Sequence, residues 1–114
     1  MNYIHLYDRE RYLFETVRAR FHANGWLSAF DFFCIVIWKA NRSKSRVASR
    51  LIKSDPRKRT TLDAIVRDMT AALYNAVTPY ERLKLLIEDW KLRLPMASAI
   101  LTVLWPEEFT VYDA

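Results

Sequence analysis

The sequence predicts an all-α fold, a compact bundle of five to six helices. Apolar residues recur at spacings of three and four along most of the chain, which is the period of one face of a helix. Residues that begin and end helices separate these stretches, and no β-hairpin signal occurs. With 114 residues, 52% of them hydrophobic, the chain supports one core, so we expect a single helical domain over residues 1–114.

The composition excludes several kinds of site. A single glycine, Gly25, leaves no glycine-rich loop for nucleotide phosphates. A single cysteine, Cys34, forms no internal disulfide, and His5 and His22 lie far from any cluster of ligand spacing. We therefore expect no metal, no cofactor and a reducing, cytoplasmic location, with Cys34 packed as a small hydrophobic residue.

The charge balance permits an anionic partner. The net charge is +5 and the pI is near 9.6, which suits nucleic acids or other anionic surfaces. The longest apolar run, Phe32–Trp38, is far shorter than the roughly 20 residues that span a bilayer. The N-terminal stretch carries acids and no signal-peptide pattern, so we expect no membrane segment.

The first predicted helix covers Asp8–Asn24. Leu13, Val17 and Phe21 repeat at every fourth position and mark its buried face. Gly25 follows at the position where a left-handed residue commonly ends a helix.

The second predicted helix, Ser28–Ala40, is expected to be the central one. Ser28 is its N-cap, and Asp31 stands three residues later as in a loose capping box. After Asp31 the helix is apolar on nearly every face, which is typical of a buried helix in a soluble protein.

A basic segment, Asn41–Arg59, follows. Val47, Leu51 and Ile52 are spaced for a short helix, which an Asp-Pro pair ends. Clustered Lys and Arg neutralise nucleic-acid phosphates; the alternative is a solvated connector between two helices. The positive residues, opposed only by Asp55, are Arg42, Lys44, Arg46, Arg50, Lys53, Arg57, Lys58 and Arg59.

Two further helices are predicted between residues 60 and 90. Thr60 or Thr61 caps the first, Leu62–Val77, and Thr78-Pro79-Tyr80-Glu81 combines the start signals of the second, which runs to Trp90. The residues expected on the buried faces are Leu62, Ile65, Val66, Met69, Leu73 and Val77 in the first helix, and Leu83, Leu86, Ile87 and Trp90 in the second.

The C-terminal stretch contains a turn, a helix and a short tail. Lys91–Leu94 connects to a run of small and apolar residues that begins at Pro95 and that Trp105-Pro106 ends. These prolines predict a helix of about ten residues. Phe109–Tyr112 has a strand-like pattern and leads to Asp113.

This C-terminal stretch resembles part of a DNA-repair family. Met96-Ala97-Ser98-Ala99-Ile100-Leu101, with Asp113 downstream, resembles the second half of the helix-hairpin-helix element in the HhH-GPD DNA glycosylase superfamily. In that family a Leu-Pro-Gly-Val-Gly type of hairpin precedes the helix, and a catalytic Asp lies at a fixed distance after an Ala. Aligning that Ala with Ala97 places the family's Asp on Asp113 without a gap.

A narrower resemblance covers most of the chain from Trp26 onward. Trp38-Lys39-Ala40-Asn41-Arg42 and the C-terminal helix and tail are similar to a group of small uncharacterised bacterial proteins, which carry a Trp-Lys-Ser-Pro-Arg-like segment and a Gly-Val-Gly hairpin. This resemblance alone implies a functional role for Lys39 and Arg42. Both residues also favour the macrodipole at the end of the buried helix.

The glycosylase resemblance implies only some of the family's site residues. Asp113 corresponds to the acid that stabilises positive charge on the sugar or activates a nucleophile. The attacking lysine of bifunctional members corresponds to Pro95, so lyase activity is not expected. The two hairpin glycines correspond to Lys91 and Arg93, whose cations replace amide contacts to phosphate but not the glycine turn geometry. The four-cysteine iron–sulfur motif is absent, and in the family further sequence follows the acid.

These observations favour a non-specific DNA-binding module that contacts phosphates through the basic segment and the Lys91–Arg93 turn. The first alternative is a monofunctional DNA N-glycosylase that uses Asp113. The second is a protein-interaction or vestigial domain, in which the C-terminal apolar face pairs with a partner or a second copy. The chain is expected to be either a whole domain or the N-terminal part of a longer glycosylase-like fold.

Overall fold

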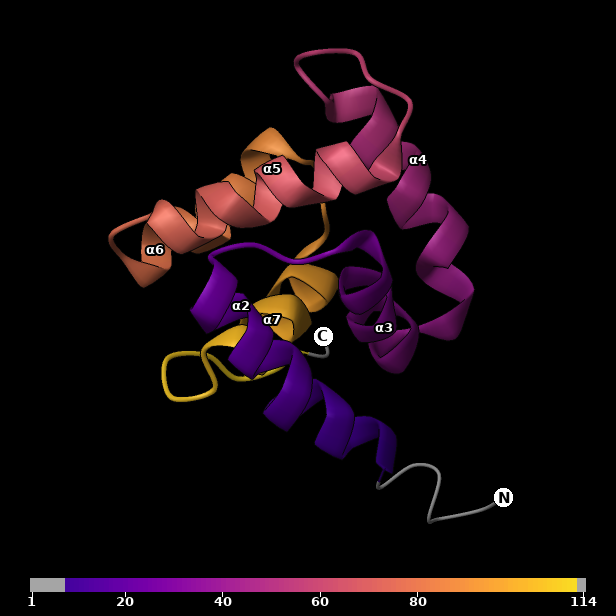
Figure 1. The fold of residues 1–114 in the computed structure, drawn as a ribbon. Coiled ribbons are helices and arrows are strands. Elements are labelled where there is room, and N and C mark those ends of the chain that lie inside the picture. Colours follow the sequence, from indigo (N-terminus) through magenta and orange to yellow (C-terminus); the bar gives the residue numbers. More distant parts are fainter. Residues whose placement is uncertain (1–7, 113–114) are drawn as a thin grey trace.

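The computed structural model describes residues 8–112, and within them the fold is all-α (Figure 1), as the sequence predicts. No strand occurs among these residues. The elements are η1 (Tyr12–Val17), α2 (Arg18–Asn24), α3 (Ala29–Lys39), η2 (Asn41–Ser43), α4 (Lys44–Ser54), α5 (Leu62–Asn75), α6 (Pro79–Lys84), η3 (Leu85–Asp89) and α7 (Leu94–Leu104). Of these, η1 and η3 are π-helical and η2 is a 3-10 helix.

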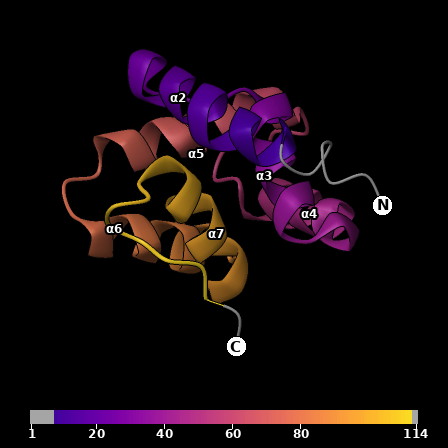
Figure 2. The ribbon, with the colours of Figure 1, turned by 90° about the horizontal axis from the view of Figure 1, so that it is seen from below.

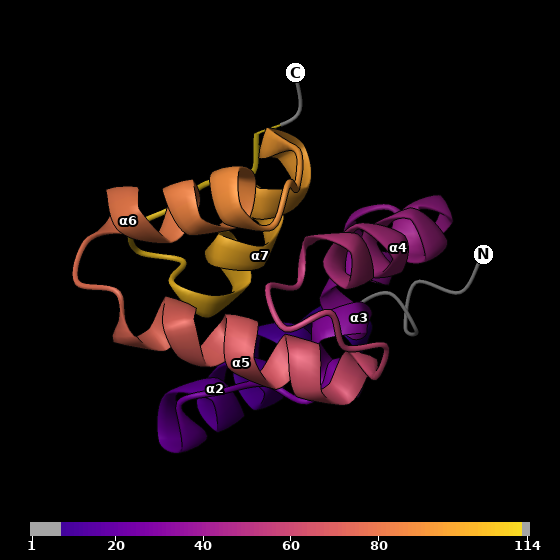
Figure 3. The same cartoon turned by 90° about the horizontal axis from the view of Figure 1, so that it is seen from above.

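Two apolar helices, α3 and α7, form the centre of the molecule. They pack against each other, and α7 also contacts η1, α2, α6 and η3. In Figure 1, α5 lies above this pair and α4 to its side. Figure 3 shows α6 and α7 side by side; η3 continues α6, and a short turn joins η3 to α7. The sequence predicts α3 as the central helix, and the structure places α7 beside it, with nearly every side chain of α7 buried.

The first predicted helix is confirmed, with one wider turn. The chain is helical over residues 8–24, and the stretch named η1 has π-helical hydrogen bonding. Leu13, Val17 and Phe21 are fully buried, as their spacing predicts. Gly25 ends the helix with a φ of 79°, the left-handed conformation that glycine adopts without a steric penalty.

At the start of α3, only one of the two side chains of the predicted capping box, Ser28, acts as a cap. Ser28 Oγ accepts a hydrogen bond from the Asp31 backbone N–H at 3.1 Å, as expected. The Asp31 carboxylate, which is 2% exposed, instead accepts from the Tyr12 hydroxyl at 2.7 Å and from the Arg20 guanidinium at 3.0 Å. Asp31 therefore fastens η1 and α2 to α3, because a buried carboxylate needs these donors.

The helix α5 ends earlier than the sequence predicts. Its last residue is Asn75, and Val77, placed on the buried face by its spacing, is 82% exposed. The Val77 N–H donates to the Glu81 carboxylate in the first turn of α6, at 3.1 Å. It therefore makes no hydrogen bond that would continue α5. The Arg82 guanidinium donates to the carbonyl of Ala76, which satisfies an oxygen left open where α5 stops.

Of the N-caps predicted for α5 and α6, only the one of α6 makes its side-chain hydrogen bond. Thr61 stands at the N-cap of α5 but its side chain makes no capping hydrogen bond. Thr78 caps α6 by accepting from the Glu81 N–H at 3.1 Å, and Pro79 follows in the first turn. Helical structure continues through η3 to Asp89, so the helix predicted to run to Trp90 is confirmed.

The last helix begins and ends where its prolines predict. α7 has Pro95 in its first turn and ends just before Trp105. The strand-like expectation for the tail is wrong: Phe109–Tyr112 pairs with no other segment and runs back along α6 and α7 (Figure 2). Its last described contact is a hydrogen bond from the Tyr112 N–H to Ser98 Oγ, at 2.8 Å. Asp113 lies outside the described residues.

The buried apolar side chains form one cluster that draws on all the α-helices except α6. None of the helices in the described part of the chain is both long and apolar enough to cross a bilayer.

Candidate nucleic-acid interface

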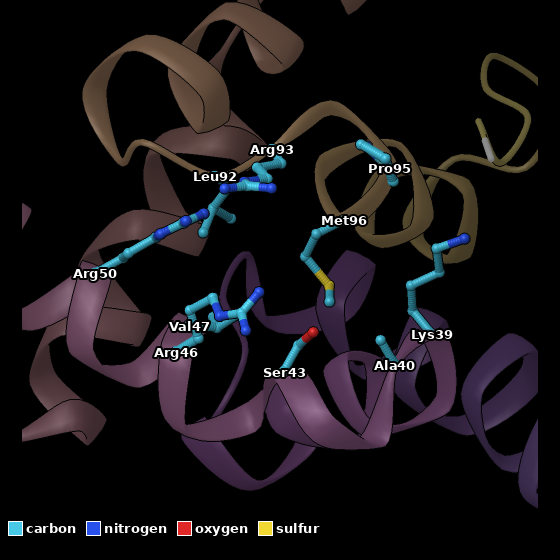
Figure 4. Close-up of a pocket in the computed structure, with 10 residues that line it drawn as sticks. All are labelled: Lys39, Ala40, Ser43, Arg46, Val47, Arg50, Leu92, Arg93, Pro95 and Met96. Carbon is cyan, nitrogen blue, oxygen red and sulfur yellow. The ribbon is translucent and has the colours of Figure 1, made fainter. Parts of the chain in front are cut away.

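A hollow of about 130 Å³ opens where the end of α3, the first half of α4 and the turn before α7 meet (Figure 4). The turn before α7 lies more than forty residues from the other two segments in the sequence and is brought to them by the packing of α3 on both α4 and α7. We refer to this hollow as the arginine pocket. The residues that line it are Lys39, Ala40, Ser43, Arg46, Val47, Arg50, Leu92, Arg93, Pro95 and Met96.

The arginine pocket has an apolar floor and a cationic rim. Val47, Leu92 and Met96 are buried and form the floor. Figure 4 shows Arg46 and Arg50 extending from α4 toward the turn that carries Leu92 and Arg93. These buried residues anchor α4 and the turn. The long cationic side chains can then lay their aliphatic stems on the apolar surface and keep their charged ends in water.

The register of α4 explains why two arginines reach the same place. Val47 and Leu51 are buried and fix the orientation of the helix. Arg46 and Arg50 are four residues apart and therefore lie on one face. Lys53 continues that face one turn later, although it does not line the arginine pocket.

Among the described residues, the three arginines of the rim have no acidic partner. The side chains of Arg46, Arg50 and Arg93 make no hydrogen bond or ion pair within this part of the chain. Like charges that are held close together repel one another, and this cost is relieved when an anion binds between them. A rim of this kind can attract an anion.

The sequence around the arginine pocket is free of acids. No acidic residue occurs between Asp31 and Asp55, or between Asp89 and Glu107. These two stretches carry eight of the 18 Lys and Arg residues, whereas the other ten share the rest of the chain with all 13 acids. The positive charge is thus concentrated on the elements that form the pocket, and the remainder of the chain carries a net negative charge.

The N-terminus of α7 adds positive potential at the same place. Arg93 is its N-cap and makes no side-chain capping bond, while the Ala97 N–H bonds to the Arg93 carbonyl. The N–H groups of Leu94 and Met96 have no intrahelical acceptor, as in the first turn of any α-helix. The partial positive charge of the helix dipole at this end favours an anion beside Arg93.

The turn before α7 is made without glycine. Lys91 has a φ of 62°, and the Leu92 N–H donates to the Leu86 carbonyl at 3.0 Å. This closure spans seven residues, one more than the six-residue bond that typically accompanies a left-handed residue at the end of an α-helix, because the preceding element η3 is π-helical. At one of the two family glycine positions, Lys91, the backbone is thus left-handed, between the buried neighbours Trp90 and Leu92, whereas Arg93, at the other, is extended.

We expect the Lys91→Gly variant to be more stable than the parent. The left-handed conformation costs a residue with a Cβ about 1–2 kcal/mol, and glycine's greater freedom in the unfolded chain offsets part of the gain. The net expectation is a rise of about 0.5–1 kcal/mol in the free energy of unfolding, measured by urea denaturation. Lys91→Ala removes the same charge but keeps the Cβ, so an equal gain in that variant would contradict the explanation.

The remaining predicted residues are divided between two places. Lys39 lines the arginine pocket. Arg42 in η2 and Lys44 in α4 are exposed and are the sequence neighbours of the pocket residue Ser43. Lys58, which is exposed with a φ of 55°, lies with Arg57 and Arg59 in the loop after α4. The basic segment therefore does not converge on one face as a whole.

Arg57 and Arg59 already have acidic partners. Arg59 donates through Nε and Nη2 to the buried carboxylate of Asp55, both at 3.0 Å, and through Nη1 to Asp68. Arg57 lies 3.7 Å from Asp68. The geometry gives Arg59 a role in holding the loop together, apart from any contact with a nucleic acid.

Several pocket residues are absent from the sequence-based candidates. Ser43 carries no local signal, and Met96 enters the sequence argument only within the motif that resembles the glycosylases. Pro95 enters it as a helix start and as the position where a catalytic lysine is missing. In Figure 4 the Ser43 hydroxyl points up toward Met96 and the interior of the pocket. The spacing of Arg46 and Arg50 and the two acid-free stretches are the signals that would have located the pocket.

Besides the arginine pocket, three other kinds of site come into question: a reactive thiol, a metal site and a partner surface on α7. Burial raises the pKa of the half-buried Cys34 thiol, as does the charge of Asp31, which suits a packed side chain more than a reactive one. Within residues 8–112 no three His, Cys, Asp or Glu side chains are grouped to hold a metal ion. Most side chains of α7 are buried inside the chain; pairing of the C-terminal apolar face with a partner or a second copy stays a prediction.

No protein-family model, curated protein or solved structure matches this chain. The resemblance to the glycosylases rests on the sequence motifs alone.

Proposed function

We propose that this protein is a non-specific nucleic-acid-binding module that holds DNA by its phosphates. The observation that carries the proposal is the convergence of Arg46, Arg50 and Arg93 on one pocket at the N-terminus of α7, where none of them has an acidic partner among residues 8–112. Sequence-independent DNA binding depends mainly on such cations.

The arrangement suits phosphate in particular. A guanidinium presents its N–H groups as a planar fork that pairs with two phosphate oxygens at once. Arg46 and Arg50 approach from α4, and Arg93 from the opposite wall. The orphan N–H groups at the start of α7 complement the charge. No element of this set reads a base edge, so we expect affinity without sequence preference.

Substituting the three arginines together is the decisive test. For wild-type protein we expect duplex DNA binding in the range of about 1–100 μM, falling steeply with salt. In Arg46→Ala/Arg50→Ala/Arg93→Ala we expect at least a tenfold loss of affinity at low salt. The slope of log affinity against log salt concentration should shrink by about one, since the three guanidinium groups converge on one phosphate and each phosphate contact contributes roughly 0.9. Fluorescence anisotropy with a labelled duplex measures both quantities.

A charge-matched control separates the pocket from net charge. Arg9→Ala/Arg18→Ala/Lys84→Ala removes three positive charges from elements away from the arginine pocket, and it should retain most of the affinity. An equal loss in both triple variants would leave only a general charge effect. An affinity that does not change with salt would refute phosphate binding altogether.

A monofunctional glycosylase is the second candidate function. The observation that favours it is the hydrogen bond from Tyr112 to Ser98, because it fastens the chain one residue before Asp113 to the helix whose N-terminus lines the arginine pocket. The test is base excision from duplexes that carry damaged bases. Excision by wild type but not by Asp113→Asn supports the idea; equal activity, or none in either protein, ends it.

A further inference from the structure

The arginine pocket is a small hollow between three segments of the chain. It is bounded by the end of α3, by α4 and by the turn before α7. Val47, Leu92 and Met96, all of which are buried, form its apolar lining. An internal phosphate continues into a strand on both sides, whereas a phosphate at a strand end continues on one side only, so the terminal group needs less room.

The size of the pocket supports a small group. A volume of about 130 Å³ compares with the roughly 10–15 Å³ that one water occupies by this measure. The pocket thus accommodates a phosphate and the sugar attached to it, but not a length of strand. The apolar floor offers the sugar a surface without competing donors or acceptors.

The three positive charges at the rim match the charge and the free oxygens of a phosphate monoester better than those of an internal phosphate. A diester carries one negative charge on two free oxygens. A phosphate monoester carries about −1.5 to −2 at neutral pH and has three free oxygens. Arg46, Arg50 and Arg93 together supply three guanidinium forks, and the Ser43 hydroxyl lies below them. Three forks match three oxygens, and the attraction between the charges rises with the charge of the ligand.

We propose that the arginine pocket binds a terminal phosphate monoester, such as the phosphorylated end of a nucleic-acid strand, in preference to an internal phosphodiester. This inference rests on the proposed function and identifies the chemical group that its main site takes. Internal phosphates then contact exposed cations beyond the pocket, of which Lys53 continues the α4 face.

The test compares two oligonucleotides that differ only in one end. A single-stranded oligonucleotide with a 5′-phosphate and the same sequence with a 5′-hydroxyl are titrated with wild-type protein at moderate salt. We expect the phosphorylated strand to bind at least tenfold more tightly. A parallel pair with a 3′-phosphate or a 3′-hydroxyl identifies the preferred end. Equal affinity for phosphorylated and unphosphorylated strands at both ends would overturn the inference.

The arginine variants assign the preference to the pocket. In Arg46→Ala/Arg50→Ala/Arg93→Ala the preference for phosphorylated ends should vanish, and in Arg9→Ala/Arg18→Ala/Lys84→Ala it should remain. A preference that survives the pocket variant places the site elsewhere and overturns the inference. Circular dichroism shows whether each variant keeps its helical content, and single substitutions Arg46→Lys and Arg50→Lys, which keep the charge and lose the fork, should reduce the preference without unfolding the protein.

Competition distinguishes the source of the monoester. Adenosine monophosphate that displaces the phosphorylated strand at concentrations near its own dissociation constant points to free nucleotides, and weak displacement points to strand ends; both outcomes require the monoester pocket. Displacement by adenosine as strong as that by adenosine monophosphate would contradict it. The proposed function fails separately: if no strand binds in a salt-dependent way, DNA binding itself is refuted, whereas salt-dependent binding without end preference refutes only this inference.

Discussion

Replacing Arg59 with alanine is expected to destabilise the protein by about 3 kcal/mol, because removal of one partner from a buried ion pair leaves the charge of the other buried and unpaired. The Asp55 carboxylate is fully buried, and the Arg59 side chain is only 23% exposed. Asp55 also accepts from the backbone N–H groups of Arg57 and Arg59, but these neutral donors do not replace the lost charge. A loss of this size is a large share of the 5–15 kcal/mol typical of a domain, and urea denaturation measures it.

The same pair predicts how the effect changes with pH. The hydrogen bond from the Arg59 side chain holds the pKa of Asp55 well below its usual range, against the opposing effect of burial. A carboxyl whose pKa is lowered by folding contributes its full stabilisation above the unfolded value, near 3.9, and loses it as the pH falls through the folded pKa. In Arg59→Ala the pKa of Asp55 rises, so the stability difference from wild type should be full at pH 6–7 and should shrink below about pH 4.

Arg57→Ala is the matched control. Arg57 also lies near Asp68, but at 3.7 Å and with a side chain 73% exposed. Exposed pairs contribute about 0–1 kcal/mol, so we expect little change. A similar loss in both variants, or a loss in Arg59→Ala that is independent of pH, would show that the Asp55–Arg59 pair is not the cause.

Replacing Arg82 with alanine is expected to cost about 3 kcal/mol as well. Its side chain, 11% exposed, donates to the carbonyls of Leu73 and Ala76 at the end of α5 and pairs with Glu108 at 3.0 Å. It also stacks on Trp105, with Cζ 4.0 Å from the ring centroid. Hydrogen bonds that involve a charged group contribute about 1.5–3 kcal/mol each, and the two carbonyls lose their side-chain partner. Thermal and urea unfolding measure the loss.

Two further variants test that explanation. Arg82→Lys keeps the charge but cannot reach two carbonyls and a carboxylate at once, since an ammonium is a point donor; it should recover less than half of the loss. Lys84→Ala, which removes an exposed pair with Glu88 at 3.9 Å, should change stability by under about 0.5 kcal/mol. Full stability in Arg82→Lys would mean that charge alone, and not the fork, matters.

The ends of the helices follow from signals that act within one turn of the chain. Gly25 adopts its left-handed conformation because it lacks a Cβ, and Thr78 caps α6 through a hydrogen bond that spans three residues. Pro95 stands in the first turn of α7, where its missing N–H costs no hydrogen bond. Such signals need no knowledge of the rest of the fold, so the sequence alone predicts the all-α class and most helix boundaries.

The exceptions are residues whose partners lie far along the chain. Val77 has the spacing of a buried residue, yet it is exposed because its N–H serves Glu81 and α5 stops. Asp31 has the position of a capping residue, yet its carboxylate binds Tyr12, 19 residues away. In each case a hydrogen bond to a residue outside the helix outweighs the local preference. The spacing of apolar residues along the sequence gives no information about such bonds.

The candidate site shows the same division. The sequence by itself determines that positive charge gathers in two acid-free stretches, and Lys39, Arg46, Arg50 and Arg93 are all among its candidates. It does not distinguish these from Arg59, whose charge is taken up by Asp55 and Asp68. Only the packing of α3 against α4 and α7 brings the two stretches to one pocket. The reason is physical: charge is a property of each residue, but whether it is neutralised or left open depends on which distant side chains folding places within reach.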